Sequence, residues 1–172
     1  MRRLLKLVCE LLGILISLSI LGACKKVEKA TAVVENQNLE FNYQKMPDRI
    51  EINPDAAAIV DDWREFKDFN ASIDVLYKAT NNEDLALAID DLIEKEKKMA
   101  DGIYPELFDT FQIKSRQRVL RTFLYKAKAS IQENQPTTQP IVEALEAYNN
   151  MRKQLNVIMN SQLDKKLILD EA

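Results

Sequence analysis

Residues 53–78, NPDAAAIVDDWREFKDFNASIDVLYK, decide the fold because they combine a helix start with a long apolar stripe. Asn53 can cap a helix, Pro54 suits the first helical position, and Asp55 favours the positive end of the helix. Apolar residues then recur at alternating steps of four and three, which places them on one helical face. The stripe has one polar member and comprises Ile59, Trp63, Phe66, Asn70, Ile73 and Tyr77. The segment therefore predicts a single amphipathic helix that runs to about Lys78.

Three further helices are predicted downstream by their caps and their apolar spacing. Thr80 and Glu83 form a capping-box pattern, and the helix that follows them should end at Gly102. A third helix should span 111–133, and after a loop bracketed by prolines the last helix should begin at Pro140. Because four helices with short connections lie beside their neighbours, we expect an all-α fold, an antiparallel up-and-down bundle of about four helices.

The composition supports a helical domain over 54–172 and excludes several kinds of catalytic and metal-binding site. Ala, Leu, Glu, Lys and Gln, which are abundant here, lose least on entering a helix. The chain has no histidine, and its only glycine outside the N-terminal segment is Gly102. Histidine-based triads, histidine zinc sites and glycine-rich phosphate loops are therefore excluded. We expect a protein that is not an enzyme, with no cofactor, no catalytic residue and no metal site.

The N-terminal residues 1–23 have the pattern of a secretory signal peptide. Three cations lie within residues 1–6, and residues 11–21 form an apolar core of suitable length. Glu10 directly precedes this core and leaves a second interpretation open. That interpretation is an uncleaved membrane anchor, because residues 7–23 are close to the roughly 17 residues that can just span a bilayer.

The end of this segment, Leu21-Gly22-Ala23-Cys24, resembles the lipobox of bacterial lipoproteins. The resemblance implies that the signal is cut before Cys24 and that this cysteine is acylated as the mature N-terminus. Several acyl chains on one cysteine hold a protein stably at a membrane, whereas a single chain holds it marginally. Cys9 would leave with the signal, so no cysteine would remain for a disulfide. We expect the first partner to be a membrane, bound through the lipid on Cys24.

Residues 24–53 lack sustained helical periodicity, and we interpret them as the lipidated N-terminus and a flexible tether whose end can pack on the domain. As a flexible coil this segment would reach about 30 Å on average. Removal of residues 1–23 takes away three cations and one anion from 24 and 27, leaving 21 basic and 26 acidic residues and a net charge of −5. This acidity argues against nucleic acid as a partner.

The third predicted helix carries a basic face. At 100° per residue, five of its residues fall within an arc of about 80°. They are Lys114, Arg118, Arg121, Tyr125 and Lys128. One interpretation is a dock for an anionic ligand or an acidic partner. The other is ion pairing with the acidic first and second helices, which is common between neighbouring helices, and the sequence leaves both open.

Two arginines fall on apolar helix faces. Arg116 lies at about 200° from Lys114, inside the apolar arc of about 180° to 280° on the third helix. Arg152 lies between Tyr148 and Leu155 on the last helix. We expect both arginines to be buried, either in a polar layer with a carboxylate that fixes helix register or in a pocket for a carboxylate or phosphate ligand.

Three segments resemble small helical bacterial lipoproteins to which no activity is attached: DDWREF (61–66), NEDLAL (82–87) and KSRQRVL (114–120). Neither an acid-rich stretch nor an aspartate directly follows Cys24, so we expect a lipid-anchored protein on the periplasmic face of the outer membrane in the bacterial cell envelope. We predict a helical interaction or scaffold module with a protein partner in the envelope. The alternative is a ligand-binding or chaperone-like module that uses the basic third helix for an anionic ligand.

Overall fold

The helical part of the chain begins where its capping residue predicts. Asn53 accepts a hydrogen bond from the backbone N–H of Ala56 at 2.8 Å, and Pro54 opens the first helix. The structure, a computed structural model, describes residues 41–170, with side chains up to residue 162. The predicted lipidation residue and lipobox lie outside these described residues: Cys24, Leu21, Gly22 and Ala23.

The regular secondary structure among the described residues is all helical, and no strand occurs among them. The α-helices are α2 (Pro54–Asp62), α3 (Arg64–Leu76), α4 (Asn82–Asp101), α5 (Phe111–Gln132) and α6 (Thr138–Asp170), with 3-10 turns η1 (Tyr43–Lys45) and η2 (Glu106–Phe108). The predicted all-α class is confirmed. Within residues 41–170, no helix is both long enough and apolar enough to cross a membrane.

The single helix predicted for residues 53–78 is interrupted at Trp63. Its backbone is extended, with φ −86° and ψ 92°, and separates α2 from α3. The indole ring is buried and lies 5.4 Å from the ring of Phe66 and 5.0 Å from that of Tyr104, centroid to centroid. Burial of this large ring against two others outweighs the helical preference of the surrounding residues.

Among the other helix ends, the starts of α4 and α6 differ from the prediction, and α6 begins at Thr138 rather than at Pro140. Asn81 caps α4 by accepting a hydrogen bond from Asp84 N–H at 2.9 Å, so the capping box predicted at Thr80 is wrong by one residue. Gly102 ends α4 as predicted, and Thr110 caps α5. The Asn81 amide also donates to the Asp84 carboxylate at 2.7 Å, a second contact that Thr80 could not make.

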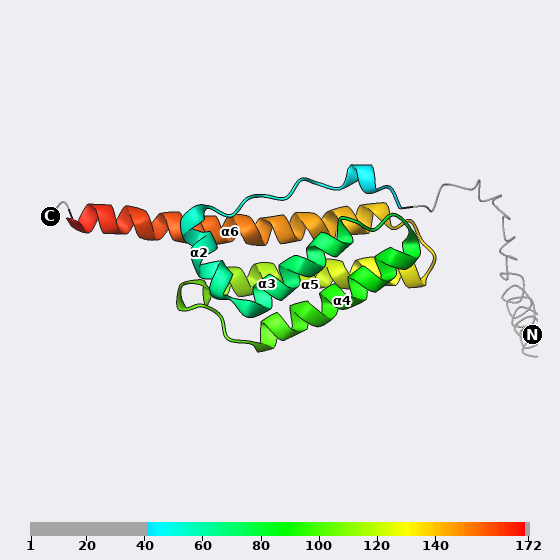
Figure 1. The fold of residues 1–172 in the computed structure, drawn as a ribbon, viewed down its shortest axis with the longest axis horizontal. Helices are drawn as coiled ribbons and strands as arrows, with labels where there is room; N and C mark the ends of the chain where they lie inside the picture. The colour runs from blue at the N-terminus through cyan, green and yellow to red at the C-terminus, as the bar shows by residue number, and fades with distance from the viewer. Residues whose placement is uncertain (1–40, 171–172) are drawn as a thin grey trace, which may run out of the picture. The chain divides into compact units, whose positions relative to one another are not determined.

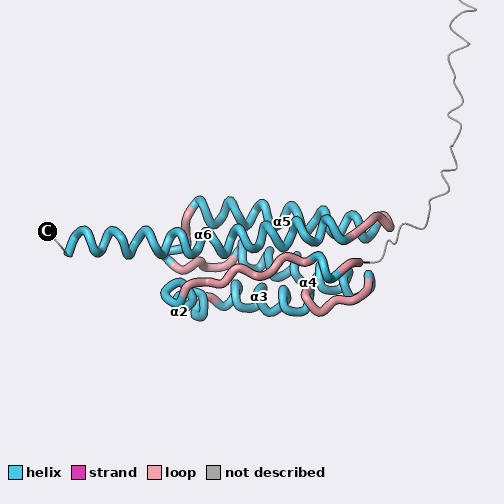
Figure 2. The backbone as a smooth tube through the Cα atoms, turned by 90° about the horizontal axis from the view of Figure 1, so that it is seen from above, coloured by secondary structure: helices cyan, strands magenta, loops and turns pink. Residues whose placement is uncertain are grey.

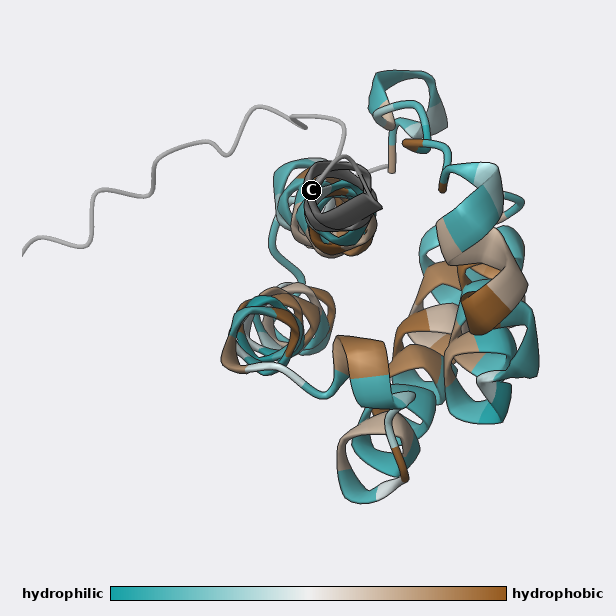
Figure 3. Cartoon of the chain, turned by 90° about the vertical axis from the view of Figure 1, so that its left-hand side faces the viewer, coloured by the Kyte–Doolittle hydropathy of each residue, from teal (hydrophilic) through white to brown (hydrophobic). Residues whose placement is uncertain are grey.

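The helices pack through their apolar faces into one core. The closest pairs are α5 with α6, α3 with α4, and α4 with α5, and α2 contacts both α3 and α6 (Figure 1). Seen end-on, the apolar segments of neighbouring helices turn towards one another (Figure 3). The largest fully buried side chains include Trp63, Tyr148, Phe66, Phe69 and Phe108.

An extended segment, residues 41–53, lies lengthwise over the helices, and we call it the strap (Figure 2). It begins at the start of α6, where the backbone N–H of Asn42 donates to Thr138 Oγ1 at 2.9 Å, and ends at the cap of α2. The end of the segment predicted as a tether over residues 24–53 thus packs on the domain, as the sequence allowed, and this packed part covers residues 41–53. Polar side chains of α6 hold this segment by its main chain, a contact that periodicity in the segment itself does not reveal.

Candidate functional site

The basic face of α5 is largely neutralised by acidic neighbours. Lys114 forms an ion pair with Asp109, which lies just before the helix, and Lys128 pairs with Asp90 of α4 at 2.7 Å. Arg121 pairs with Glu96, also on α4. The predicted pairing with an acidic neighbouring helix therefore holds for Arg121 and Lys128, while Lys114 pairs with the segment just before its own helix.

The other two members of the predicted face have no carboxylate partner among the described residues. The Arg118 guanidinium carbon lies 5.7 Å from the centroid of the Phe111 ring, a cation–π arrangement. Tyr125 is about half-exposed. Arg118 is thus the one cation of this face that keeps its charge available at the surface of the described structure.

A buried carboxylate, Glu96, organises the inner side of the same region. Its side chain is 1% exposed, and Arg121 binds it with two hydrogen bonds, Nε to Oε2 at 2.6 Å and Nη2 to Oε1 at 3.0 Å. Gln117 Nε2 donates to Glu96 Oε1 at 2.9 Å, and the Tyr104 hydroxyl donates to Gln117 Oε1. No buried side-chain polar atom of this cluster lacks a hydrogen-bond partner, which is what a buried charge requires. The sequence places Glu96 among the acidic residues of the second helix that could pair with the basic face, but does not predict its burial, because it lies among five other charged residues between 94 and 101.

Electrostatic effects on this cluster follow from its burial and its charge. The pKa of Tyr104 is raised above its ordinary value by burial and then by the nearby Glu96 carboxylate. The pKa of Arg121 is raised chiefly by its hydrogen bonds to Glu96. Both groups therefore stay protonated near neutral pH and cannot act there as proton acceptors.

The prediction that Arg116 is buried is wrong, because the side chain is exposed. The buried residues of α5 are Ile113, Gln117, Leu120, Leu124 and Ala127. On the angular scale used above, these buried residues centre near 260°. Gln117 lies inside the buried arc, whereas Arg116 lies about 60° from its centre and falls outside the arc. Phe123, at about 180°, is only half-buried and made the apolar arc look wider than it is.

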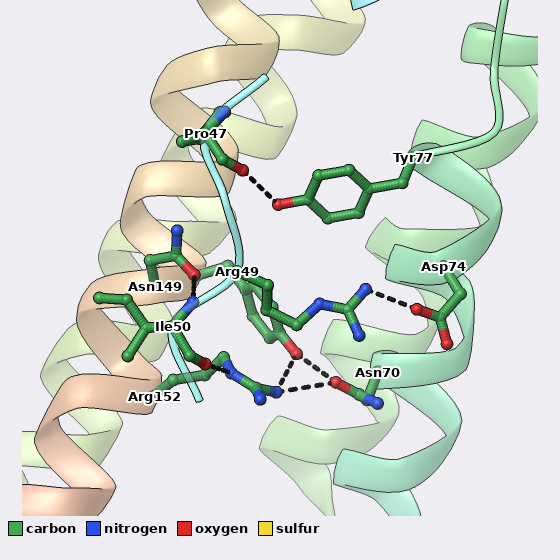
Figure 4. A network of polar contacts seen from close by, with 9 residues as sticks. Pro47, Arg49, Ile50, Asn70, Asp74, Tyr77, Asn149 and Arg152 are labelled. Carbon is green, nitrogen blue, oxygen red and sulfur yellow. Dashed lines mark hydrogen bonds and ion pairs between the residues drawn. The ribbon is translucent and has the colours of Figure 1, made fainter. Parts of the chain in front are cut away.

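Arg152 is buried as predicted, but its partners are neutral oxygen atoms rather than a carboxylate. Its Nη1 donates to Asn70 Oδ1 at 3.0 Å and to the Tyr148 hydroxyl at 2.8 Å, and its Nε donates to the backbone carbonyl of Ile50 at 2.5 Å (Figure 4). The Tyr148 hydroxyl in turn donates to Asn70. The predicted polar layer is therefore present around Asn70 and Arg152, without Arg116.

A surface cavity opens between the end of α4 and the start of α5. It has a volume of about 580 Å³ and is lined by Ile103, Tyr104, Lys114, Arg118 and Arg121 together with Asp101 and Asp109. Two large apolar side chains at this end are open to solvent, Ile103 at 89% and Phe111 at 74%. The end of α4 and the start of α5 lie at the opposite end of the helices from the start of the strap (Figure 1). We call the surface formed here by Ile103, Phe111 and Arg118 the distal surface.

The side chains at this end of the molecule are charged, aromatic and aliphatic groups. Within the part of the chain that the structure describes, no three Cys, Asp or Glu side chains gather as metal ligands would. The cavity offers paired charges, one surface guanidinium and apolar rims, which suit contact with another molecule. Comparisons of this chain with protein-family models, with curated proteins and with solved structures give no match.

Proposed function

We propose that this protein is a lipid-anchored, non-enzymatic interaction module of the bacterial cell envelope, held at a membrane through Cys24. The lipobox resemblance at residues 21–24 supports the anchor, and an outer-membrane location facing the periplasm follows from the residues after Cys24. We also propose that α3, α4, α5 and α6 form an antiparallel up-and-down bundle, which their short connections favour.

The observation that carries the proposal is the solvent exposure of Ile103 and Phe111 on the distal surface. Large apolar side chains that are this exposed at one end of a domain favour a contact site there. Arg118, without an ion pair among the described residues, rests over Phe111 and adds a positive charge to the patch. The surface therefore fits a protein partner with an apolar patch beside acidic residues.

Crosslinking in intact cells tests this proposal. Phe111→Asp should abolish recovery of the partner that the wild-type chain captures, because a carboxylate would be placed in the apolar contact. Leu87→Asp is the matched control, since Leu87 is equally large and exposed but lies in the first turns of α4. Equal recovery from both variants would rule out the distal surface as the contact.

Metabolic labelling tests the anchor separately. An alkyne-bearing fatty acid should label the wild-type chain and leave Cys24→Ala unlabelled. A labelled Cys24→Ala chain would show that the lipid, if any, is attached elsewhere.

A second candidate, binding of an anionic ligand by α5, is favoured by one observation: Arg118 lines the 580 Å³ cavity without an ion pair among the described residues. Inorganic phosphate at millimolar concentration should then raise the melting temperature of the wild-type chain and not that of Arg118→Ala. An equal effect on both chains would eliminate this candidate. Arg121 is unsuitable for the test because its removal would leave the buried Glu96 carboxylate without its ion-pair partner.

A further inference from the structure

The strap is bound by its main chain, and two asparagines of α6 do most of the binding. Each side-chain amide donates a hydrogen bond to the carbonyl of one strap residue and accepts one from the N–H of the residue two positions further on. Asn149 donates to Asp48 O at 2.7 Å and accepts from Ile50 N at 3.0 Å, and Asn156 donates to Glu51 O at 2.8 Å and accepts from Asn53 N at 2.9 Å. Contacts of this kind depend on an extended backbone rather than on particular strap side chains.

The spacing of the two asparagines matches the repeat of an extended chain. They are seven residues apart on α6, which corresponds to about 10.5 Å at 1.5 Å per residue. The groups that they bind are displaced by three residues along the strap, which is about 10 Å at 3.3 Å per residue. The helix thus presents a pair of amides in register with any extended peptide laid along it.

Side-chain selectivity is supplied from α3. Arg49 of the strap pairs with Asp74 at 2.5 Å, and its guanidinium carbon lies 5.2 Å from the centroid of the Tyr77 ring (Figure 4). The Tyr77 hydroxyl donates to the carbonyl of Pro47 at 2.7 Å. Asp74 and Tyr77 therefore form a recess for a cationic side chain directly beside the backbone contacts.

The floor of this groove is polar and is covered only by the strap. Asn149 and Arg152 are both more than nine-tenths buried, yet the strap residues above them are exposed or half-buried. Ile52 is the one aliphatic strap residue that enters a cavity, of about 300 Å³, next to Phe66 and Arg152. Phe41, Met46 and Ile52 give the strap its apolar contacts with the core, whereas residues 47–51 are held mainly by polar contacts, each of small net strength in water.

We propose that the groove between α3 and α6 is a binding site for an extended peptide with a cationic residue, and that the strap occupies it until such a peptide from another protein displaces it. Once uncovered, Asn149, Asn156 and Arg152 would need new partners, which a second extended chain can supply. The cation enters the recess of Asp74 and Tyr77. This site is separate from the distal surface, so it stands or falls independently of the function proposed above.

The test uses the full chain in detergent and a fluorescent peptide with the sequence of residues 45–53, KMPDRIEIN. Ile50→Pro removes the N–H that Asn149 accepts and releases the strap while the groove stays intact. By fluorescence anisotropy, this variant should bind the peptide at least about tenfold more tightly than the wild type, because more of its sites are open. Adding Asn149→Ala and Asn156→Ala should weaken that binding by at least about tenfold.

Two control peptides distinguish specific binding in the groove from nonspecific binding to the protein. One carries N-methyl isoleucine at the position of Ile50, and the other carries glutamate at the position of Arg49; both should bind at least about tenfold more weakly. Arg49→Ala, whose strap backbone is unaltered, gives a second strap-weakened chain and should fall between wild type and Ile50→Pro. Absence of binding to both strap-weakened chains, or binding unchanged by loss of the two asparagines, would overturn the proposal.

Discussion

Removal of Arg121 should expose how much the buried Glu96 carboxylate depends on one partner. In Arg121→Ala, Glu96 loses two charge-assisted hydrogen bonds and keeps only the one from Gln117 at 2.9 Å. Breaking a fully buried ion pair costs about 3–5 kcal/mol, because a charge is left in the interior. Here the Arg121 side chain is 39% exposed, so water can replace part of its hydrogen bonding to Glu96. We therefore expect a loss of about 2–3 kcal/mol in the free energy of unfolding.

Urea unfolding followed by circular dichroism measures this loss. With a slope of about 2 kcal/mol per molar urea, the midpoint should fall by about 1 M. Lys114→Ala is the matched control on the same helix, because it breaks a half-exposed pair with Asp109 and should cost less than about 1 kcal/mol.

A second substitution tests the physical reason. Adding Glu96→Gln to Arg121→Ala removes the unpaired charge, so the double variant should be more stable than Arg121→Ala alone. An Arg121→Ala chain within about 0.5 kcal/mol of wild type, or a double variant less stable than the single one, would refute the reasoning.

Three further outcomes follow from buried polar groups elsewhere. Burial raises the pKa of Tyr148 above its ordinary value of 10.0, so the folded state holds its proton more tightly than the unfolded state. Stability should therefore be full below about pH 10 and fall as pH rises above it, and Tyr148→Phe should reduce this fall in urea unfolding at pH 9–11. Trp63 Nε1 is buried without a hydrogen-bond partner, so Trp63→Phe should cost less than about 1.5 kcal/mol, whereas Trp63→Ala should cost about 3–5 kcal/mol. Arg152→Ala should speed hydrogen exchange at the amide of Ile50, because the adjoining carbonyl loses its donor; unchanged exchange there would contradict the role given to Arg152 in holding the strap.

Local signals in the sequence predicted most of the helices and their ends. Asn53, Gly102 and Thr110 act through groups within four residues of themselves, so their roles can be predicted from spacing alone. The break at Trp63 could not be predicted in this way. It depends on a ring contact with Tyr104, 41 residues away in the sequence, and nothing local indicates that contact.

The sequence predicted only those parts of the candidate site that depend on the position of a residue around its own helix. The α5 angles correctly grouped the basic residues, but the buried arc was placed about 30° from its observed centre, which put Arg116 inside it and Gln117 outside, and only packing against α4 fixes that position. The burial of Glu96 was not predicted because it depends on Gln117 and Arg121 of another helix. The docking of the strap was only partly expected for the same reason, since its binding groups lie about a hundred residues downstream.

The main-chain contacts of the strap divide the chain into positions that tolerate substitution and positions that do not. Asp48 and Glu51 contribute carbonyl oxygens, and their side chains are exposed, so nearly any residue can replace them. Asn149 and Asn156 offer a donor and an acceptor from one side chain, which among the twenty amino acids only asparagine and glutamine amides provide in this form. A saturation scan should therefore show tolerance at Asp48 and Glu51 and intolerance at Asn149 and Asn156, while Arg49 is a strap position whose own side chain is recognised.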